Sequence, residues 1–426
     1  MKLLILSSNN GQGHNTAARA LLEAARKQDI EAVMMDGMLF DSPKASEWVA
    51  RIHVRSALYA PHLFEKGTRI ARRMEDNPRL TDSLQRSGMA ASRRLLAFIR
   101  DNEFDTVIAT HIFSAQVLTH VEDALRDRVR TAFVITDYSY IPFTSDTALD
   151  AYILPHKDLV PLYEWNAPGK CYLPLGIPTS PEKLRHWEKE EARRSLGLPQ
   201  GRPTVLIMTG SMGFGDVLPL CAALLDGEPR VQILALCGRN EKLLSALKEN
   251  YSPDKVLPLG YTEEAGKYMD AADVLLSKPG GLSSTEAAVK GVPLVHMNPL
   301  PGWEEDNVRF FTARGMSLTG KDAEEMARSA LMLLKEPATA EVMHRCQQAN
   351  INPEAAREIL VALDSKKSKR KRGFSGSPSI KHKKMSKKSK KGVDKAEESG
   401  YTEEAVARDG PRGRAGERQQ GTLKTI

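Results

Sequence analysis

The sequence predicts an α/β fold built from two doubly wound, Rossmann-like units that face a cleft. Short β-branched or leucine-rich runs alternate with helical patterns through both halves of residues 1–364, which is typical of parallel sheets covered by helices. The chain has 426 residues, of which 41% are hydrophobic. It is therefore too long for one hydrophobic core of ordinary size, and two domains are expected.

Ten short apolar runs are the predicted strands. In the first half these runs are residues 3–7, 32–36, 106–110, 131–136 and 151–154. In the second half they are residues 204–209, 231–237, 256–259, 273–277 and 293–297. In open sheets of this kind, ligands bind beyond the carboxyl ends of the strands. We therefore expect the chemistry to lie in the loops that follow these runs.

A proline-rich stretch at residues 174–203 separates the two sets of strands and contains one charged helical pattern, at 182–196. This composition suits an interdomain connection. We therefore predict a first domain at 1–175, a linker at 176–203 and a second domain at 204–364. The last helices of the second domain are candidates to pack back on the first.

The positive charge of the chain belongs to its C-terminal tail. Residues 366–426 carry nineteen Lys and Arg against seven Asp and Glu, so the remaining residues have a net charge of −5 within the total of +7. Because the tail offers almost nothing to bury, we predict that residues 365–426 are disordered. A solvated tail, attraction to anionic lipid and attraction to nucleic acid all remain open.

Cysteine usage and hydropathy favour a cytoplasmic protein. The four cysteines are scattered without a CxxC pair or a Cys/His spacing suited to a metal, so we expect reduced thiols. The apolar run at residues 3–6 is too short for a signal peptide and reads as a strand. No stretch of about 18 apolar residues occurs, so any membrane contact is expected to be peripheral.

Residues 47–74 are a candidate membrane-contacting segment. Aromatic and aliphatic residues, among them Trp48 and Phe64, are interleaved there with several Arg and Lys, which suits a segment lying among lipid headgroups. An internal helix pair packed on the first domain is an equal alternative, since Pro61 interrupts the pattern.

The first candidate site loop is residues 8–16, directly after the first strand. Gly11 and Gly13 allow a tight turn, and His14 follows them at the expected mouth of the cleft. The spacing matches neither the dinucleotide fingerprint nor a phosphate-binding P-loop. An imidazole here can take a proton from an attacking hydroxyl, although simple capping of the next helix is an alternative.

The second half supplies loops suited to a diphosphate. Residues 277–286 combine a strand end, a glycine pair and a new helix, whose first amides and dipole favour an anion. Glu286 could bind the two hydroxyls of a ribose, or could be an ordinary N-terminal helix charge. Further strand-end loops lie at 209–215, 237–240, 260–261 and 298–307, and the last of these concentrates carboxylates and an amide suited to a sugar.

These motifs resemble the glycosyltransferase family of monogalactosyldiacylglycerol synthases and processive diacylglycerol glucosyltransferases. The matching pieces are Gly11-Gln12-Gly13-His14, Thr136-Asp137, Cys237-Gly238-Arg239-Asn240, Lys278-Pro279-Gly280-Gly281-Leu282 with Glu286, and Pro299-Leu300-Pro301-Gly302 with Glu304, Glu305 and Asn307. The resemblance covers most of residues 1–330. It implies a GT-B fold, with the acceptor on the first domain and a UDP-sugar on the second.

The resemblance also implies roles for individual residues. His14 is the expected general base, Asp137 is a second candidate for acceptor activation or a strand-end cap, and Gly11, Gly13 and Asn15 are expected to line the acceptor. Glu286 is expected to hold the ribose, and Gly280 and Gly281 the diphosphate. The other expected donor-side residues are Gly210, Ser211, Met212, Gly213, Gly238, Arg239, Asn240, Gly260, Tyr261, Ser277, Lys278, Pro279, Leu282, Ser283, Glu304, Glu305 and Asn307.

The predicted activity is inverting transfer of a hexose from UDP-glucose or UDP-galactose to diacylglycerol or a related lipid, by a protein held peripherally on the inner face of the membrane. The chain contains no Asp-x-Asp pair, so neither a metal nor another cofactor is expected. Trp303 stands where the family usually has Gln, which leaves the sugar open. Alternatives are a different acceptor, an epimerase, or a non-catalytic protein that binds nucleic acid through its tail.

Overall fold

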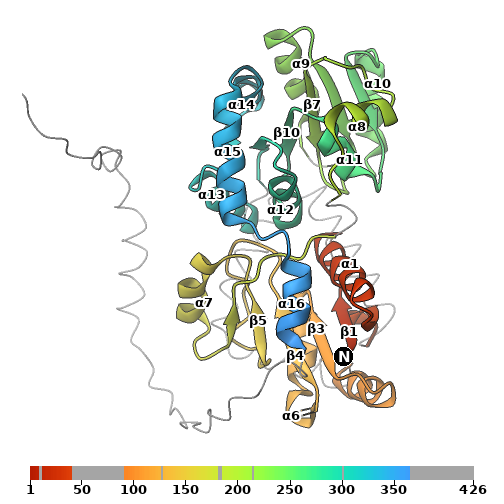
Figure 1. Cartoon of the computed structure of the whole chain (residues 1–426), viewed down its shortest axis with the longest axis vertical. Coiled ribbons are helices and arrows are strands. Elements are labelled where there is room, and N and C mark those ends of the chain that lie inside the picture. The colour runs from red at the N-terminus through yellow and green to blue at the C-terminus, as the bar shows by residue number, and fades with distance from the viewer. Residues whose placement is uncertain are drawn as a thin grey trace, which may run out of the picture. The chain divides into compact units, whose positions relative to one another are not determined.

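The computed structural model describes residues 1–8, 12–40, 91–125, 128–180, 185–213, 215–299 and 302–364. All of them belong to one compact unit, Met1–Lys369. Two parallel sheets of six strands each organise this unit (Figure 1). The segment at 47–74, Gly11 and the basic tail lie outside the described residues.

The first sheet has the strand order β2-β1-β3-β4-β5-β6, and all its pairs are parallel. Its strands are β1 Lys2–Ser7, β2 Glu31–Asp36, β3 Thr106–Ala109, β4 Arg130–Val134, β5 Ala151–Ile153 and β6 Tyr172–Leu173. Its connections contain α1 Gln12–Lys27, η1 Gly37–Phe40, α5 Ile112–Thr119, α6 Glu122–Leu125, η2 Lys157–Leu159 and α7 Val160–Asn166. Residues 91–101 are also helical.

The second sheet has the order β12-β11-β10-β7-β8-β9 and is also entirely parallel. Its strands are β7 Thr204–Met208, β8 Gln232–Leu236, β9 Val256–Leu259, β10 Val274–Ser277, β11 Leu294–His296 and β12 Leu318–Thr319. The helices are α8 Lys189–Ser195, α9 Val217–Gly227, α10 Glu241–Asn250, α11 Ala265–Ala271, α12 Gly281–Lys290, α13 Trp303–Thr312, α14 Ala323–Lys335, α15 Pro337–Asn350 and α16 Ala355–Leu363.

The structure confirms all ten predicted strands and adds β6 and β12. Each added strand has only two residues and lies at the edge of its sheet, which is too short for an apolar run to be recognised. The predicted helical pattern at 182–196 is helical only at Lys189–Ser195 within the described residues.

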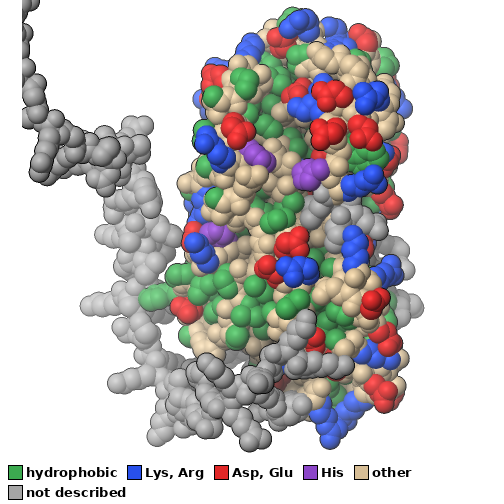
Figure 2. All heavy atoms as spheres, in the orientation of Figure 1, with side chains coloured by type: hydrophobic (Ala, Val, Ile, Leu, Met, Phe, Trp, Pro, Cys, Tyr) green, Lys and Arg blue, Asp and Glu red, His purple; other side chains and the backbone are tan. Residues whose placement is uncertain are grey.

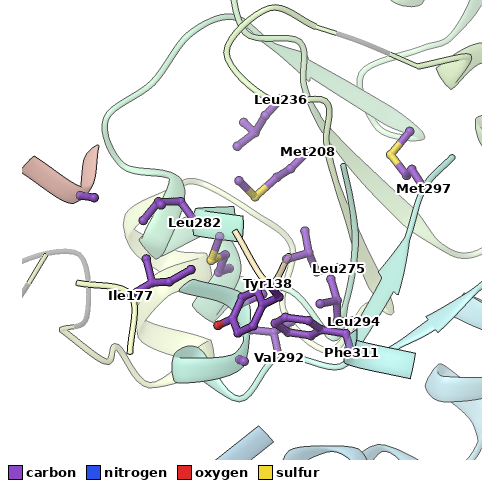
Figure 3. Close-up of a cluster of buried hydrophobic side chains, with 14 of the residues drawn as sticks. Tyr138, Ile177, Met208, Leu236, Leu275, Leu282, Val292, Leu294, Met297 and Phe311 are labelled. Carbon is purple, nitrogen blue, oxygen red and sulfur yellow. The ribbon is translucent and has the colours of Figure 1, made fainter. Parts of the chain in front are cut away.

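The hydrophobic core continues from one sheet to the other. One cluster of buried side chains includes Leu4 of β1, Val205 of β7 and the linking residues Tyr138 and Ile177. Figure 3 shows Tyr138 and Ile177 together with apolar side chains of the second domain, such as Leu275 of β10 and Phe311 of α13. The two domains are therefore packed together rather than joined by the linker alone.

Helix α16 returns from the second domain to the first. Ile359, Leu360 and Leu363 lie in one buried cluster with Leu3 of β1 and Leu21 of α1, and Figure 1 shows α16 beside α1. Burying such a side chain contributes about 1.5–3 kcal/mol. The C-terminal helix therefore helps to hold the two domains together.

Each sheet contains a switch point, where successive connections leave in opposite directions. In the first sheet this point lies between β1 and β3, and in the second between β7 and β10. Ligands of doubly wound sheets bind at the carboxyl edge of such a point. The segments found there begin α1 and α5 in the first domain, and follow β7 and β10 in the second.

Candidate active site

His14 lies in the first turn of α1, beyond the carboxyl end of β1. Its Nδ1 atom is 2.9 Å from the carbonyl oxygen of Thr110 and 3.0 Å from Oγ1 of Thr136. A carbonyl oxygen can only accept, so Nδ1 carries the hydrogen in this arrangement. The lone pair is then on Nε2, which is the ring atom able to take a proton.

The helix begins at Gln12 rather than after Thr16, so His14 stands on the helix and not in a glycine turn. The first turn tolerates Gly13 because its amide needs no partner within the helix. Asn15, in the same turn, is buried and accepts a hydrogen bond of 2.6 Å from the Ser7 hydroxyl. This bond ties the start of α1 to the end of β1.

His111 is a further member of this site, and no sequence motif indicated it. Its ring meets that of His14 edge-on, with centroids 4.6 Å apart. It also caps α5, because Nδ1 accepts from the amide of Phe113 at 3.3 Å. His111 directly follows the strand predicted at 106–110, but its position after a strand was the only sequence feature that pointed to it.

Asp137 follows β4 and lies against the start of α12 in the second domain. Its carboxyl accepts hydrogen bonds from the Gly281 amide and from Nδ2 of Asn307, the latter at 2.9 Å. Burial raises the pKa of Asp137 to about 6, although both hydrogen bonds act in the opposite direction. Its carboxyl therefore titrates within the range that a proton-transfer site uses.

The two glycines that start α12 have different surroundings. A Cβ on Gly281 would collide with the carbonyl group of Thr136, whereas one on Gly280 would meet nothing within 4 Å. Gly281 therefore lies against the first domain in this structure, and Gly280 is the glycine with open space beside it. Leu282 and Ser283 follow in the same helical turn.

The loops after β7 and β8 form one connected surface. Nδ2 of Asn240 donates to the Gly213 carbonyl at 2.9 Å, and the Arg239 amide donates to the Ser211 carbonyl at 2.9 Å. Gly213 and Gly238 both have positive φ and lie so close to the facing loop that a Cβ would collide with its backbone. The positive φ and the close approach both require glycine at these two positions. Gly210 and Met212 lie in the same turn as Gly213.

Tyr261 and Lys278 extend this surface on either side. The Tyr261 side chain is 49% exposed, and the Arg239 guanidinium lies 5.4 Å from its ring centroid. Lys278 forms an ion pair of 2.7 Å with Glu304. A half-exposed aromatic ring and a lysine at strand ends suit a nucleobase and a phosphate, respectively.

Helix α13 contains the predicted sugar-facing residues. Glu304, Glu305 and Asn307 lie in its first two turns rather than in a loop. Glu304 is buried beside Lys278, Glu305 is exposed, and Asn307 is completely buried.

Glu286 is half-buried, in the second turn of α12. Among the described residues, no group of three or more His, Cys, Asp or Glu is placed to hold a metal ion.

The structure therefore brings His14, Asp137, Gly281 and Asn307 to one place, where the first domain meets the second. The surface around Gly210, Arg239 and Tyr261 follows the neighbouring strands of the second sheet. The arrangement brings an imidazole, which can accept a proton, from one domain near a helix start suited to an anion from the other.

Comparison with known proteins identifies both halves of the chain. Residues 14–178 match the family model for monogalactosyldiacylglycerol (MGDG) synthase, and residues 204–359 match the glycosyltransferase family 28 C-terminal domain. The crystal structure of MurG from Acinetobacter baumannii is similar in fold, with a TM-score of 0.57, 15% identity and coverage of 85% of this chain and 99% of that chain. The two family matches, together with this fold, define a GT-B glycosyltransferase.

Two curated relatives cover nearly the same extent. The processive diacylglycerol beta-glucosyltransferase of Bacillus pumilus is 28% identical over 349 residues, which are 80% of this chain and 89% of the relative. The enzyme of that name from Bacillus subtilis is 27% identical over 354 residues, covering 82% and 90%. Over residues 14–359 the chain is therefore related to the MGDG synthases and the processive diacylglycerol glucosyltransferases.

Proposed function

We propose that the protein transfers a hexose from UDP-glucose or UDP-galactose to the hydroxyl of diacylglycerol or a related lipid, with inversion at the anomeric carbon. The observation that carries this proposal is the hydrogen bond between Nδ1 of His14 and the Thr110 carbonyl. This bond leaves Nε2 as the proton acceptor, at the carboxyl edge of the first sheet. Nδ1 also contacts Thr136, and the neighbouring Asp137 accepts a hydrogen bond from the Gly281 amide of α12.

The proposed reaction is a single displacement. The acceptor oxygen forms a bond to the anomeric carbon as its proton passes to Nε2 of His14, and the bond from that carbon to the diphosphate oxygen breaks. The leaving UDP carries the new negative charge. Backbone amides at the start of α12, the helix dipole and Lys278 are the groups that stabilise it. We propose that no metal is needed, so UDP release should continue in EDTA.

Donor recognition in this proposal uses the second domain. Glu286 accepts hydrogen bonds from the ribose, Tyr261 lies against the uracil, and Gly280 gives the diphosphate close access to the backbone. The open space beside Gly280 supports its part in this assignment.

The proposed acceptor requires contact with a membrane. Among the described residues, no helix is long and apolar enough to span one. Helix α7 exposes Leu162 and Trp165 by 41% and 72%, and Figure 2 shows hydrophobic side chains on the face that carries α7. Tryptophan suits the headgroup region. We propose that α7, segment 47–74 and the basic tail all contact anionic lipid, at the inner face of the membrane.

The test is UDP release from UDP-glucose or UDP-galactose in the presence of mixed lipids. Release that depends on diacylglycerol is expected. Release without any lipid would indicate another acceptor, and tight polynucleotide binding without release would indicate a non-catalytic protein. For the tail, vesicle binding at low salt by a chain ending at Asp364 should be weaker than binding by the full chain; equal binding would remove the tail from the proposal.

A further inference from the structure

Asn307 uses its side-chain amide within the protein. Its Oδ1 atom accepts from the Tyr138 amide at 2.7 Å, and its Nδ2 atom donates to Asp137 at 2.9 Å and to the Pro279 carbonyl at 2.9 Å. The residue is completely buried. Both amide hydrogens are therefore engaged, and none is left for a sugar hydroxyl in this arrangement.

These hydrogen bonds join parts of the two domains. Asp137 and Tyr138 follow β4 of the first sheet, whereas Pro279 lies between β10 and α12 of the second. Asn307 comes from α13 and contacts both segments. Its side chain therefore links the end of β4 to residues 278–281, between β10 and the start of α12, which are called the donor loop below.

Tyr138 strengthens the same junction. Its ring stacks on Phe310 at 4.6 Å between centroids and meets Phe311 edge-on at 5.0 Å. Its hydroxyl lies 2.7 Å from Oγ1 of Thr285 on α12. Figure 3 shows the Tyr138 and Phe311 rings side by side. A residue of the first domain is therefore inserted into the core of the second.

The junction connects directly to the base. Thr136, which lies 3.0 Å from Nδ1 of His14, is separated by one residue from the Tyr138 amide that Asn307 holds. The Thr136 carbonyl also packs closely against Gly281. The position of the His14 ring and the position of the donor loop are thus set by one short segment.

We infer that Asn307 is a positioning residue: it couples closure of the two domains to the alignment of His14 with the donor loop. This inference rests on the proposed function for the roles of His14 and of that loop. It differs from a sugar-binding role because Asn307 acts on protein groups from both domains. Without the Asn307 amide, the domains should separate more readily. The His14 ring should then no longer be aligned with the donor loop.

Interdomain distance tests the inference without turnover. Spin labels on the exposed Cys171 of the first domain and on a cysteine introduced by Glu249→Cys in the second, with Cys346→Ser, report domain separation in the full chain. Asn307→Ala and Gly281→Ala should shift the distances to longer and broader values. Gly280→Ala should match the parent, because its Cβ meets no protein atom.

Tyr138→Phe is a second variant that keeps the inference testable if Asn307→Ala does not fold. It removes only the hydroxyl contact with Thr285 and keeps the ring packing, so it should open the domains partially. If both Asn307→Ala and Tyr138→Phe give the parental distance distribution, the coupling does not exist.

Binding and kinetics separate this role from sugar recognition. For Asn307→Ala, kcat should fall by about tenfold or more, while the ratio of UDP-glucose affinity to UDP affinity stays within about twofold of the parent. A tenfold fall in that ratio, at unchanged interdomain distance, would assign Asn307 to the sugar instead. Absence of UDP binding to the parent protein would overturn the proposed function, and is distinguishable from both results.

Discussion

The imidazole of His111 lies edge-on to the imidazole of His14, with ring centroids 4.6 Å apart, and both rings lie at the switch point of the first sheet. Since His111 also caps α5, its ring is anchored from a second element. We interpret the His111 ring as a steric barrier that limits rotation of the His14 ring. In the proposed reaction this makes His111 a positioning residue, because its ring contacts that of His14.

Substitution of His111 should separate its two roles. His111→Asn keeps a side chain that caps helices well but removes the ring, so kcat should fall with little change in the free energy of unfolding. His111→Phe keeps the ring but loses the cap, and should retain more activity while losing about 1 kcal/mol of stability. Steady-state kinetics and denaturant unfolding measure the two effects. Equal kcat in His111→Asn and the parent would contradict the positioning role.

His14→Ala should lose about 100-fold or more in turnover, because the variant lacks the atom that takes the acceptor proton. UDP affinity should be retained, since the proposed donor surface lies in the other domain. Kinetics and calorimetry with UDP measure the two quantities. His120→Ala, at an exposed position just after α5, is the matched control and should leave both unchanged. Parental activity in His14→Ala would exclude it as the base.

Glu286→Ala should weaken UDP binding by about tenfold or more, because a hydrogen bond to a charged acceptor contributes about 1.5–3 kcal/mol. Glu286→Gln should lie between that variant and the parent. Calorimetry measures the affinities, and Glu341→Ala, exposed on α15, is the control. If UDP and free uracil lose affinity by the same factor, the ribose assignment is wrong.

Asp137 should make stability depend on pH. Its pKa is about 6 in the folded protein against 3.8 for an ordinary aspartate, so the folded state binds the proton more tightly. Its favourable contribution is therefore complete below the ordinary value and is lost as the pH rises through about 6. The cause is burial beside Glu304, which outweighs Asn307, the Gly281 amide and Lys278.

Denaturant unfolding of the parent and of Asp137→Asn at several pH values tests this effect. The free energy of unfolding of the parent, relative to the variant, should fall by an amount on the order of 2 kcal/mol between about pH 4 and about pH 7.5. A difference that stays constant with pH would show that the carboxyl is not perturbed.

The strands and the loops that follow them could be predicted from sequence because buried parallel strands are continuous apolar runs. The start of α1 could not, since glycine before His14 indicates a turn while the first helical turn tolerates it. His111 was missed because a lone histidine after a strand has no distinctive spacing. The inward orientation of Asn307 depends on Asp137 and Pro279, which are far from it in sequence, so no local pattern reveals it.

The proposed activity is the transfer of sugar from a UDP-sugar to a lipid hydroxyl. The most direct measurement is the rate of UDP formation from UDP-glucose and from UDP-galactose, with and without diacylglycerol in mixed vesicles. Diacylglycerol should strongly increase the rate with at least one donor, and His14→Ala should abolish the increase. A rate that is the same with and without the lipid would rule out the proposed activity.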